Sequence, residues 1–399
     1  MINFSNDMLK QFFASVSATF WREWHRINKR PIYWFASVGV MSFCYLFFLT
    51  FFHQGQPTAM PIGVVDLDQT SVSREIIRNI DATQQAKVVM QQSDYPKARQ
   101  AMQEGKIYAF IVIDHDFTKK LMNNERPTLT FYINEGYFIA GSLLLKDISY
   151  MSALTSGAYQ KKVLEAKGTS DAQIMGIIQP IAMDIHLIGN PWANYGIYLL
   201  NVLLPGELQL MVLLLTIFSI GVELKERTAR SWLKTAHHSM GAALMGKALP
   251  YTLIFTLLGI IGDVLLYRYM HYPIQAGIGW MFLTTFLLVI AYQAVGIFFI
   301  GLLPVLRDGI AMAAFYGLLA FTFAGFTFPI EYMPSNVQLF SELFPIRHYF
   351  RIYVNEALLG LDVRQSILSM MAMLAFLLLP LLIFYRLKKA VVYLHYPVK

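Results

Sequence analysis

The sequence predicts a polytopic α-helical membrane protein of six transmembrane helices, with an α/β domain inserted after the first of them. Of the 399 residues, 56% are apolar and 14% are charged, whereas charged residues make up about a quarter of an ordinary globular domain. The apolar residues form long blocks with almost no charge, but residues 53–194, between the first two blocks, have mixed charge. Lysine and arginine gather beside the blocks. These three observations together indicate the fold class.

Six apolar blocks have the length of a membrane-spanning helix, which needs about 20 residues. They cover residues 31–52, 195–222, 242–267, 276–303, 309–330 and 366–385. The first block is long for the apolar part of a signal peptide, and no small-residue cleavage site follows it. We therefore expect an uncleaved anchor as transmembrane helix 1 and helices 2–6 within residues 195–385.

Basic residues flank the apolar blocks at four places, and with six spans all four places lie on one side of the membrane. They are Arg22, Arg26, Lys29 and Arg30; Lys225, Arg227, Arg230 and Lys234; Arg307; and Arg386, Lys388 and Lys389. The positive-inside rule makes that side the cytoplasm. We expect a bacterial inner-membrane protein with both termini in the cytoplasm, including a tail at residues 386–399. The net charge of +7 then reflects the membrane, and no nucleic acid is expected as a partner.

Residues 1–30 are predicted to form an amphipathic helix at the cytoplasmic face of the membrane. Aromatic residues such as Phe13, Trp21 and Trp24 alternate there with Arg22 and Arg26, a composition that suits the interface between water and lipid. A solvated helix that packs on a partner fits the same pattern.

Residues 53–194 are predicted to form a periplasmic α/β domain. Apolar or alternating runs indicate strands, and segments with helical spacing lie between them. The expected strands are 61–66, 86–90, 106–113 and 128–133, and the expected helices are 71–80, 95–104 and 137–167. This order is typical of a small α/β domain. A second outer segment, residues 331–362, is too charged to span and is expected to dip back into the outer leaflet as short re-entrant helices.

One stretch resembles a nucleotide-binding motif without meeting its requirements. Gly241 to Lys247 matches G-x-x-x-x-G-K, but Ala248 stands where serine or threonine would bind magnesium, and no strand precedes the motif. His237 and His238 have no spaced ligand partners for a metal. We therefore expect no catalytic residue, metal or cofactor in this chain, and no ATPase site of its own.

The second span contains an ionisable residue, which is costly in hydrocarbon and often marks a transport path. Glu207 follows Pro205 and Gly206, and Asn201 and Gln209 lie nearby on the same predicted helix. We expect these five residues to line a substrate path. A neutral glutamate held by a local hydrogen bond is the alternative.

The loop at residues 223–240 carries acids, bases and a tryptophan at helical spacing. A solvated turn between two spans would not need the apolar strip formed by Trp232 and Leu233. The strip favours docking to a cytoplasmic partner, although the solvated turn remains the simpler interpretation.

Four stretches together resemble the ABC-2-type transporter permeases that have a large extracytoplasmic domain between the first and second transmembrane helices. They are Pro61–Ser71, Lys106–Phe117, Asn190-Pro191 with Leu204-Pro205-Gly206 and the Glu223–Thr228 loop, and Phe328-Pro329 to Tyr349. The resemblance covers nearly the whole chain. One departure is that the family usually has Gly-Thr after the acidic pair, whereas no glycine precedes Thr228 here.

The resemblance implies a type V ABC exporter-like permease that dimerises with a second permease, identical or different. Two cytoplasmic ABC ATPase subunits would supply ATP and magnesium, and the loop after the second span would couple to them. The coupling residues implied are Glu223, Lys225, Glu226, Arg227, Thr228, Trp232 and Leu233. The expected activity is efflux of a drug-like, lipid or other amphipathic molecule from the cytoplasm or inner leaflet, in contact with membrane lipid and with a periplasmic adaptor. The alternative is a membrane receptor or scaffold of the phage-infection-protein type, without transport activity.

Overall fold

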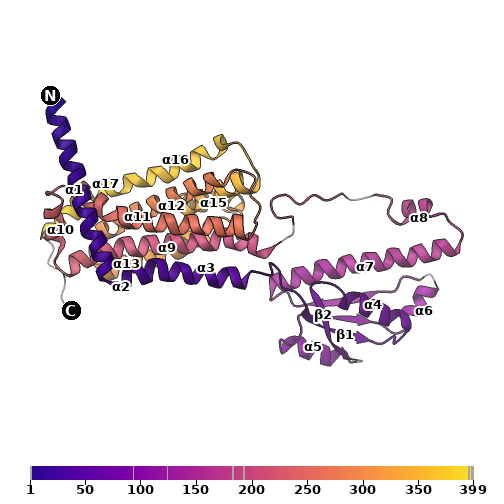
Figure 1. Cartoon of the computed structure of the whole chain (residues 1–399). Coiled ribbons are helices and arrows are strands. Elements are labelled where there is room, and N and C mark those ends of the chain that lie inside the picture. The colour runs from indigo at the N-terminus through magenta and orange to yellow at the C-terminus, as the bar shows by residue number, and fades with distance from the viewer. Residues whose placement is uncertain are drawn as a thin grey trace. The chain divides into compact units, whose positions relative to one another are not determined.

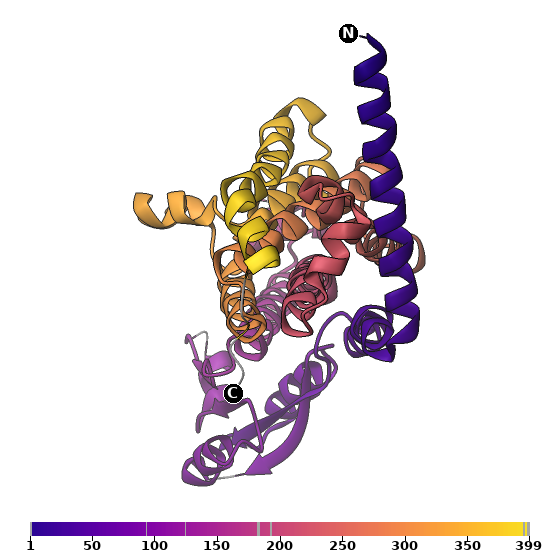
Figure 2. The ribbon, with the colours of Figure 1, turned by 90° about the vertical axis from the view of Figure 1, so that its left-hand side faces the viewer.

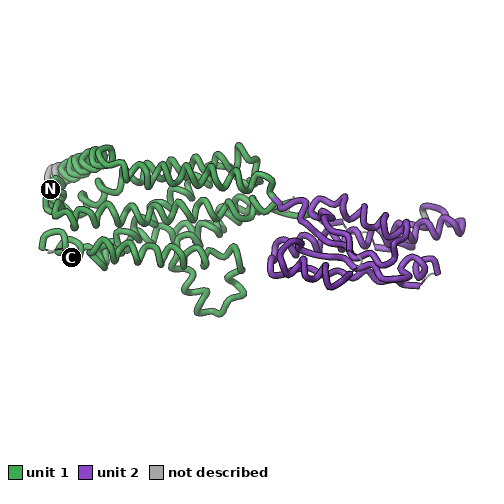
Figure 3. Tube along the Cα trace, turned by 90° about the horizontal axis from the view of Figure 1, so that it is seen from below, with its two compact units in different colours: residues 1–55, 187–399 green, residues 56–186 purple. Residues whose placement is uncertain are grey.

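The structure is a computed structural model that describes residues 2–92, 94–123, 125–181, 184–191, 194–393 and 396. The chain divides into two compact units (Figure 3). Residues 1–55 and 187–399 form the helical unit, and residues 56–186 form the sheet unit.

Five helices of the helical unit are long and apolar enough to cross a membrane. They are Pro31–Phe51, Tyr195–Lys225, Met240–Tyr269, Ile278–Leu302 and Ile367–Tyr393. In element terms these are α2 (Pro31–Trp34), η1 (Phe35–Gly39) and α3 (Val40–Phe51); α9 (Tyr195–Lys225); α11 (Met240–Val264) and η2 (Leu265–Tyr269); α12 (Ile278–Leu302); and α16 (Ile367–Ala375), η6 (Phe376–Leu378) and α17 (Leu379–Tyr393). The chain is therefore a multi-pass membrane protein.

The sixth span expected at residues 309–330 is not among these five. Its residues form α13 (Leu306–Thr322), which has 17 residues and is therefore about 25 Å long, slightly less than the roughly 30 Å of the hydrocarbon layer. The helix ends early because the chain turns soon after Thr322, where Gly325 adopts a φ of +95°. The prediction of a sixth full-length span at this point is therefore not confirmed.

Helix α9 lies at the centre of the helical unit and packs against α11, α12 and α13. Helix α12 is the most enclosed of the long helices, whereas the spans Pro31–Phe51 and Ile367–Tyr393 leave most of their apolar surface uncovered. Exposed apolar helix faces of this kind suit contact with lipid or with another membrane protein.

The N-terminal helix α1 (Ile2–Lys29) lies across one end of the bundle, the end that also carries α10 (Ala229–Thr235). Figure 1 shows that α1 does not run parallel to the long helices, and Figure 2 shows it extending beyond them. Its buried residues recur every three or four positions, at Ser15, Thr19, Glu23 and Ile27, which is the spacing of one helix face. This face packs on α11.

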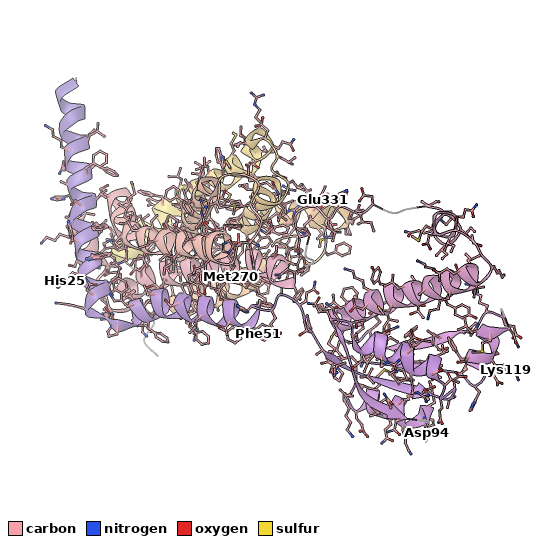
Figure 4. All side chains as sticks on the ribbon, turned by 45° about the vertical axis from the view of Figure 1, so that its right-hand side comes forward. His25, Phe51, Asp94, Lys119, Met270 and Glu331 are labelled. Carbon is pink, nitrogen blue, oxygen red and sulfur yellow. The ribbon has the colours of Figure 1, made fainter. Side chains whose placement is uncertain are left out.

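The segment between α13 and α16 consists of short helices with turns between them. They are η3 (Ile330–Tyr332), α14 (Ser335–Ser341), α15 (Pro345–Ile352), η4 (Tyr353–Leu358) and η5 (Val363–Gln365). Figure 4 shows Glu331 far from His25 of α1, near the other end of the helical unit. The short helices agree with the expected re-entrant segment, and its position in the leaflet stays a prediction.

The sheet unit contains a four-stranded sheet of order β2-β1-β3-β4. The strands are β1 (Met60–Asp66), β2 (Ala86–Gln92), β3 (Ala109–Ile113) and β4 (Leu129–Ile133). Strand β1 is parallel to both β2 and β3, and β4 is antiparallel to β3. All four strands lie at the positions that the apolar runs predicted, but β3 begins three residues later than expected, since its pairing with β1 and β4 starts at Ala109.

Helices cover both faces of this sheet. Helices α4 (Ser71–Asp81), α6 (Phe117–Met122) and α7 (Phe138–Ala166) pack on one face, and α5 (Tyr95–Gln103) packs on the other. Helix α8 (Asp171–Ile178), which the sequence did not predict, packs on α7. The compact unit ends at residue 186, so it is slightly smaller than the predicted 53–194.

Candidate functional site

The predicted coupling loop begins where α9 ends. Residues 226–228 form the turn between α9 and α10, and the backbone N–H of Thr228 donates to the carbonyl of Glu223 at 3.0 Å. Arg227 has a φ of +60°, in the left-handed region that favours glycine. The resemblance noted above leads us to expect a glycine before Thr228, and the backbone there takes a glycine-like conformation, although arginine occupies the position.

The carboxylate of Glu223 is completely buried beneath this turn. Arg22 of α1 donates to both of its oxygens, at 2.6 and 3.1 Å, and Arg26 forms a further ion pair with it. The hydroxyl of Thr228 also donates to it. A buried carboxylate is tolerated only when charged partners and hydrogen bonds replace water, and Glu223 has both.

Lys247 of α11 joins Glu223 to a second buried acid. Its Nζ lies 3.1 Å from Glu223 Oε1 and also donates to Glu23 of α1. The hydroxyl of Tyr251 donates to the other oxygen of Glu23 at 2.7 Å. We call Arg22, Glu23, Arg26, Glu223 and Lys247 the charge cluster. It links α1, α9 and α11 through side chains that are far apart in the sequence.

Glu226 extends the charge cluster toward the surface. Arg30 donates to both of its oxygens, at 2.7 and 2.9 Å, and Arg26 donates at 3.0 Å. The hydrogen bonds from Arg30 lower the pKa of the Glu226 carboxyl, so it stays ionised at neutral pH. Together Glu223 and Glu226 hold the basic side of α1 against the end of α9.

Trp232 and Leu233 do not form the exposed strip that the sequence suggested. Both are buried. The indole N–H of Trp232 donates to the carbonyl of Ala243 at 3.2 Å, and the Lys247 ammonium lies 5.1 Å from the ring centroid. A cation over an indole face is an attractive arrangement. Their apolar surface is therefore used inside this chain and is not free for a partner.

The coupling residues that remain on the surface are charged. Lys225, Glu226 and Arg227 are exposed, as are Arg230 and Lys234 of α10. Because Arg230 and Lys234 are four residues apart, they lie on one face of that short helix. The surface offered to a partner is consequently polar and mostly basic.

The nucleotide-like motif has a structural explanation. A Cβ atom at Gly246 would lie 2.5 Å from the backbone oxygen of Val16 in α1, so this glycine permits the close approach of α1 and α11. Lys247 is engaged by two carboxylates. Residues of this stretch belong to a membrane helix that begins at Met240, whereas a phosphate-binding loop needs exposed backbone N–H groups.

The predicted substrate-path residues lie mostly inside the bundle. Asn201 is buried, donates to the carbonyl of Ile197 at 2.8 Å and accepts from the Tyr267 hydroxyl at 2.9 Å. Pro205 is also buried. A Cβ atom at Gly206 would approach the Phe321 ring to 2.8 Å, so α9 and α13 are in close contact there. These residues pack α9 against two neighbouring helices in this conformation.

Glu207 and Gln209 differ from their neighbours because each has a side-chain oxygen without a hydrogen-bond partner among the described residues. Glu207 is half-buried, and neither a hydrogen bond nor an ion pair joins it to any residue in the described ranges. The buried Gln209 Oε1 is likewise without a hydrogen-bond partner among the described residues. The local hydrogen bond that would hold a neutral glutamate is thus not formed within the described part of this chain.

We did not predict Glu23 or the role of Lys247 from the sequence. Glu23 looked like one charge among many in an amphipathic helix, but it falls on the face marked by Ser15, Thr19 and Ile27. Lys247 lies six residues inside a predicted span. An acid on the buried face of one helix and a base within another are the signal that would have paired them. In the described ranges no group of His, Cys, Asp and Glu side chains could hold a metal ion.

Comparison with known proteins agrees with this architecture. The sequence profile of the ABC-2 family transporter proteins matches residues 31–386, which includes the first span, the sheet unit and most of the last long helix. A search of the curated proteins found no match. Since the profile covers most of the chain, the chain belongs to the ABC-2 family of transporter proteins.

Proposed function

We propose that this chain is the permease subunit of an ATP-binding-cassette exporter and that separate ATPase subunits drive it. As a member of the ABC-2 family it is a membrane subunit of a transporter. The ATPases would bind ATP and magnesium in the cytoplasm and dock on the turn at residues 226–228 and on α10. The transported molecule is proposed to be amphipathic, entering from the cytoplasm or the inner leaflet.

The observation that supports this proposal most directly is the charge cluster. Because Glu223 binds Arg22, Arg26 and Lys247 at once, a force applied to the adjacent turn would act on α1, α9 and α11 together. Packed interiors transmit displacement because they are dense and only slightly compressible. The exposed charges around the cluster would receive the ATPase, and the buried ones would carry its movement to the long helices.

The exposed apolar face of Pro31–Phe51 supports pairing with a second permease. Glu207, half-buried and without a partner in the described part of this chain, is proposed to contact the substrate or the second permease. The sheet unit is proposed to lie in the periplasm and to meet an adaptor protein there.

The docking surface can be tested by reversing two exposed charges. In the complex purified with its ATPase, Lys225→Glu together with Lys234→Glu should lower both ATPase recovery and ATP-dependent transport. Charge pairs at protein interfaces affect association strongly when they are desolvated, so a loss of tenfold or more is expected. The matched control is Lys388→Glu with Lys389→Glu, which makes the same charge change on exposed residues of α17.

Normal ATPase recovery and transport in the Lys225/Lys234 variant would contradict docking at this surface. An intact complex that never couples ATP hydrolysis to transport, even without substitutions, would favour the receptor or scaffold instead.

A further inference from the structure

A cavity of about 460 Å³ lies between α15 and the last long helix of the helical unit. Glu342, His348 and Arg351 line it on one side. Leu368, Ala372 and Phe376, from α16 and η6, line the other. Its volume is in the range of sites for small ligands. The cavity therefore has one charged side and one apolar side.

The charged side presents an acid and a base next to each other. Arg351 forms a two-pronged ion pair with Glu342, at 3.0 Å from Nη1 to Oε2 and 2.7 Å from Nη2 to Oε1. About a third of each side chain remains exposed, 37% for Arg351 and 36% for Glu342. Because each keeps hydrogen-bonding capacity beyond this pair, the cavity can receive a ligand that carries both charges.

His348 adds an acceptor that has no partner. The ring lies almost entirely out of solvent, and Nε2 is 3.1 Å from the backbone oxygen of Glu342. A carbonyl oxygen can only accept, so Nε2 must carry the hydrogen, and Nδ1 of the neutral ring is an acceptor. Burial lowers the pKa of His348, which favours this neutral form.

Of the two acceptors in this wall, Nδ1 of His348 is closed off from solvent, and only the carboxylate of Glu342 is open to the cavity. Nδ1 of His348 lies 3.6 Å from Glu342 Oε2 and has no hydrogen-bond partner among the residues that the structure describes. Because Nδ1 carries no hydrogen, His348 does not donate to the Glu342 carboxylate, whose Oε2 accepts from Arg351 Nη1 at 3.0 Å and has a further lone pair. An ammonium group, which donates up to three hydrogen bonds, can bind the Glu342 carboxylate there.

The apolar side of the cavity continues along a helix surface with little cover. Only 17% of the most apolar part of Ile367–Tyr393 is buried. Leu368 at the cavity is 77% exposed, and Leu382, further along the same helix, is also 77% exposed. A hydrocarbon chain attached to a group in the cavity would lie along this surface.

We propose that the cavity binds the headgroup of a zwitterionic membrane phospholipid whose nitrogen is a primary ammonium. The ammonium donates to the Glu342 carboxylate, the phosphate lies against Arg351, and the acyl chains lie along α16 and α17. This lipid is a bound component of the membrane subunit. Its binding does not depend on which molecule the permease transports.

The first test is the choice of lipid. Phosphatidylethanolamine, phosphatidylcholine and phosphatidylglycerol are added in equal amounts to the delipidated, purified full chain, and retained lipid is measured by native mass spectrometry. One phosphatidylethanolamine per chain should persist, at about tenfold or more over phosphatidylcholine, because a quaternary ammonium has no N–H to donate to the Glu342 carboxylate. Phosphatidylglycerol should also be weaker, because it brings no cation to Glu342. Equal retention of the three lipids would overturn the proposal.

The second test fills the cavity without removing a charge. Ala372→Trp places an indole among the lining residues and should reduce phosphatidylethanolamine retention about tenfold. Met371→Trp is the matched control, since Met371 is the adjacent residue on α16, is 60% exposed and lies outside the cavity lining. Unchanged retention in Ala372→Trp would contradict the site, and so would equal losses in both variants.

The third test separates recognition from packing. Glu342→Gln keeps the shape of the side chain and removes its charge, so the preference for phosphatidylethanolamine over phosphatidylcholine should fall severalfold. Glu331→Gln is the control, because Glu331 pairs with Arg347 at 2.7 Å and does not line this cavity.

The same lipid-binding assays also test two other possible occupants of the cavity. If soluble phosphoethanolamine competes as well as the intact lipid, the acyl chains contribute nothing and the ligand is not a lipid. If Ala372→Trp instead separates a dimer that carries no lipid, this face is an interface between two copies. Either result would overturn the proposal.

Discussion

At the scale of single residues, Lys247 is the most consequential side chain in the helical unit. Its Nζ contacts both Glu23 and Glu223, which are completely buried. Removing one partner of a buried pair leaves an uncompensated charge and typically costs about 3–5 kcal/mol. We therefore predict that Lys247→Met strongly lowers the thermal stability of the purified chain in detergent. The absence of a nucleotide site alone would have predicted that this lysine is dispensable.

Two further variants make this prediction specific. Lys234→Met removes an exposed lysine of α10 and should leave the unfolding temperature nearly unchanged. Glu23→Gln combined with Lys247→Met should be less damaging than Lys247→Met alone, because it removes the acid that loses its ion-pair partner, whereas Glu223 keeps Arg22 and Arg26. A single Lys247→Met variant that unfolds like the wild type would show that water or a partner replaces the ammonium.

Individual residues also show what the sequence could and could not predict about the site. The exposed charges at Lys225, Glu226 and Arg227 follow from their place between two apolar blocks. The burial of Trp232 does not follow, because a helical spacing shows which residues share a face but not what covers that face. Glu223 was expected at a partner interface, and instead three basic side chains of the same chain bind it. Such pairings depend on how α1 crosses the bundle, which a single sequence does not encode locally.

At the scale of elements, Glu226 and its arginines fasten α1 to the end of α9. Glu226→Lys would remove the hydrogen bonds from Arg26 and Arg30 and place three positive charges together. Exposed ion pairs contribute about 0.2–1 kcal/mol each, so the attachment should weaken by about 1–2 kcal/mol. Hydrogen–deuterium exchange of the backbone amides at residues 22–30 should become about 5- to 30-fold faster.

The control for this prediction is the neighbouring residue. Lys225→Glu reverses an exposed charge that forms no ion pair with any residue in the described ranges, and exchange in α1 should not change. If both variants loosen α1 equally, net charge rather than the contact of Glu226 holds the helix. A transport defect in Glu226→Lys therefore reports on α1 as well as on any ATPase contact.

The elements themselves were predicted where their pattern is local. Strand β3, whose five residues are all buried, appears in the sequence as a continuous apolar run, and α12 appears as a long uncharged block. Helix α13 was predicted too long because the apolar composition continues past Thr322, while the backbone turns at Gly325. Composition measures how apolar a segment is, whereas helix length depends on where the backbone changes direction.

At the scale of the whole molecule, the prediction concerns topology. Basic residues flank the long helices at the end that carries α1 and α10, and basic flanks remain in the cytoplasm. Alkaline phosphatase fused at residue 110 of the sheet unit should be active, as expected in the periplasm, and fusions at residues 235 and 399 should be inactive. Green fluorescent protein should give the opposite pattern at the same three sites. Active phosphatase at residue 235 would reverse the proposed orientation.

The contact between Lys247 and Glu23 also sets an order of events during synthesis. The two residues are 224 positions apart, and translation proceeds at about 5–20 residues per second. Glu23 therefore emerges from the ribosome roughly 10 to 45 seconds before its cation does. For most of this interval α1 has its arginines but neither Glu223 nor Lys247 to receive it. The first helix to be made should accordingly be among the last to settle, and nascent chains arrested before residue 240 should leave it accessible to protease.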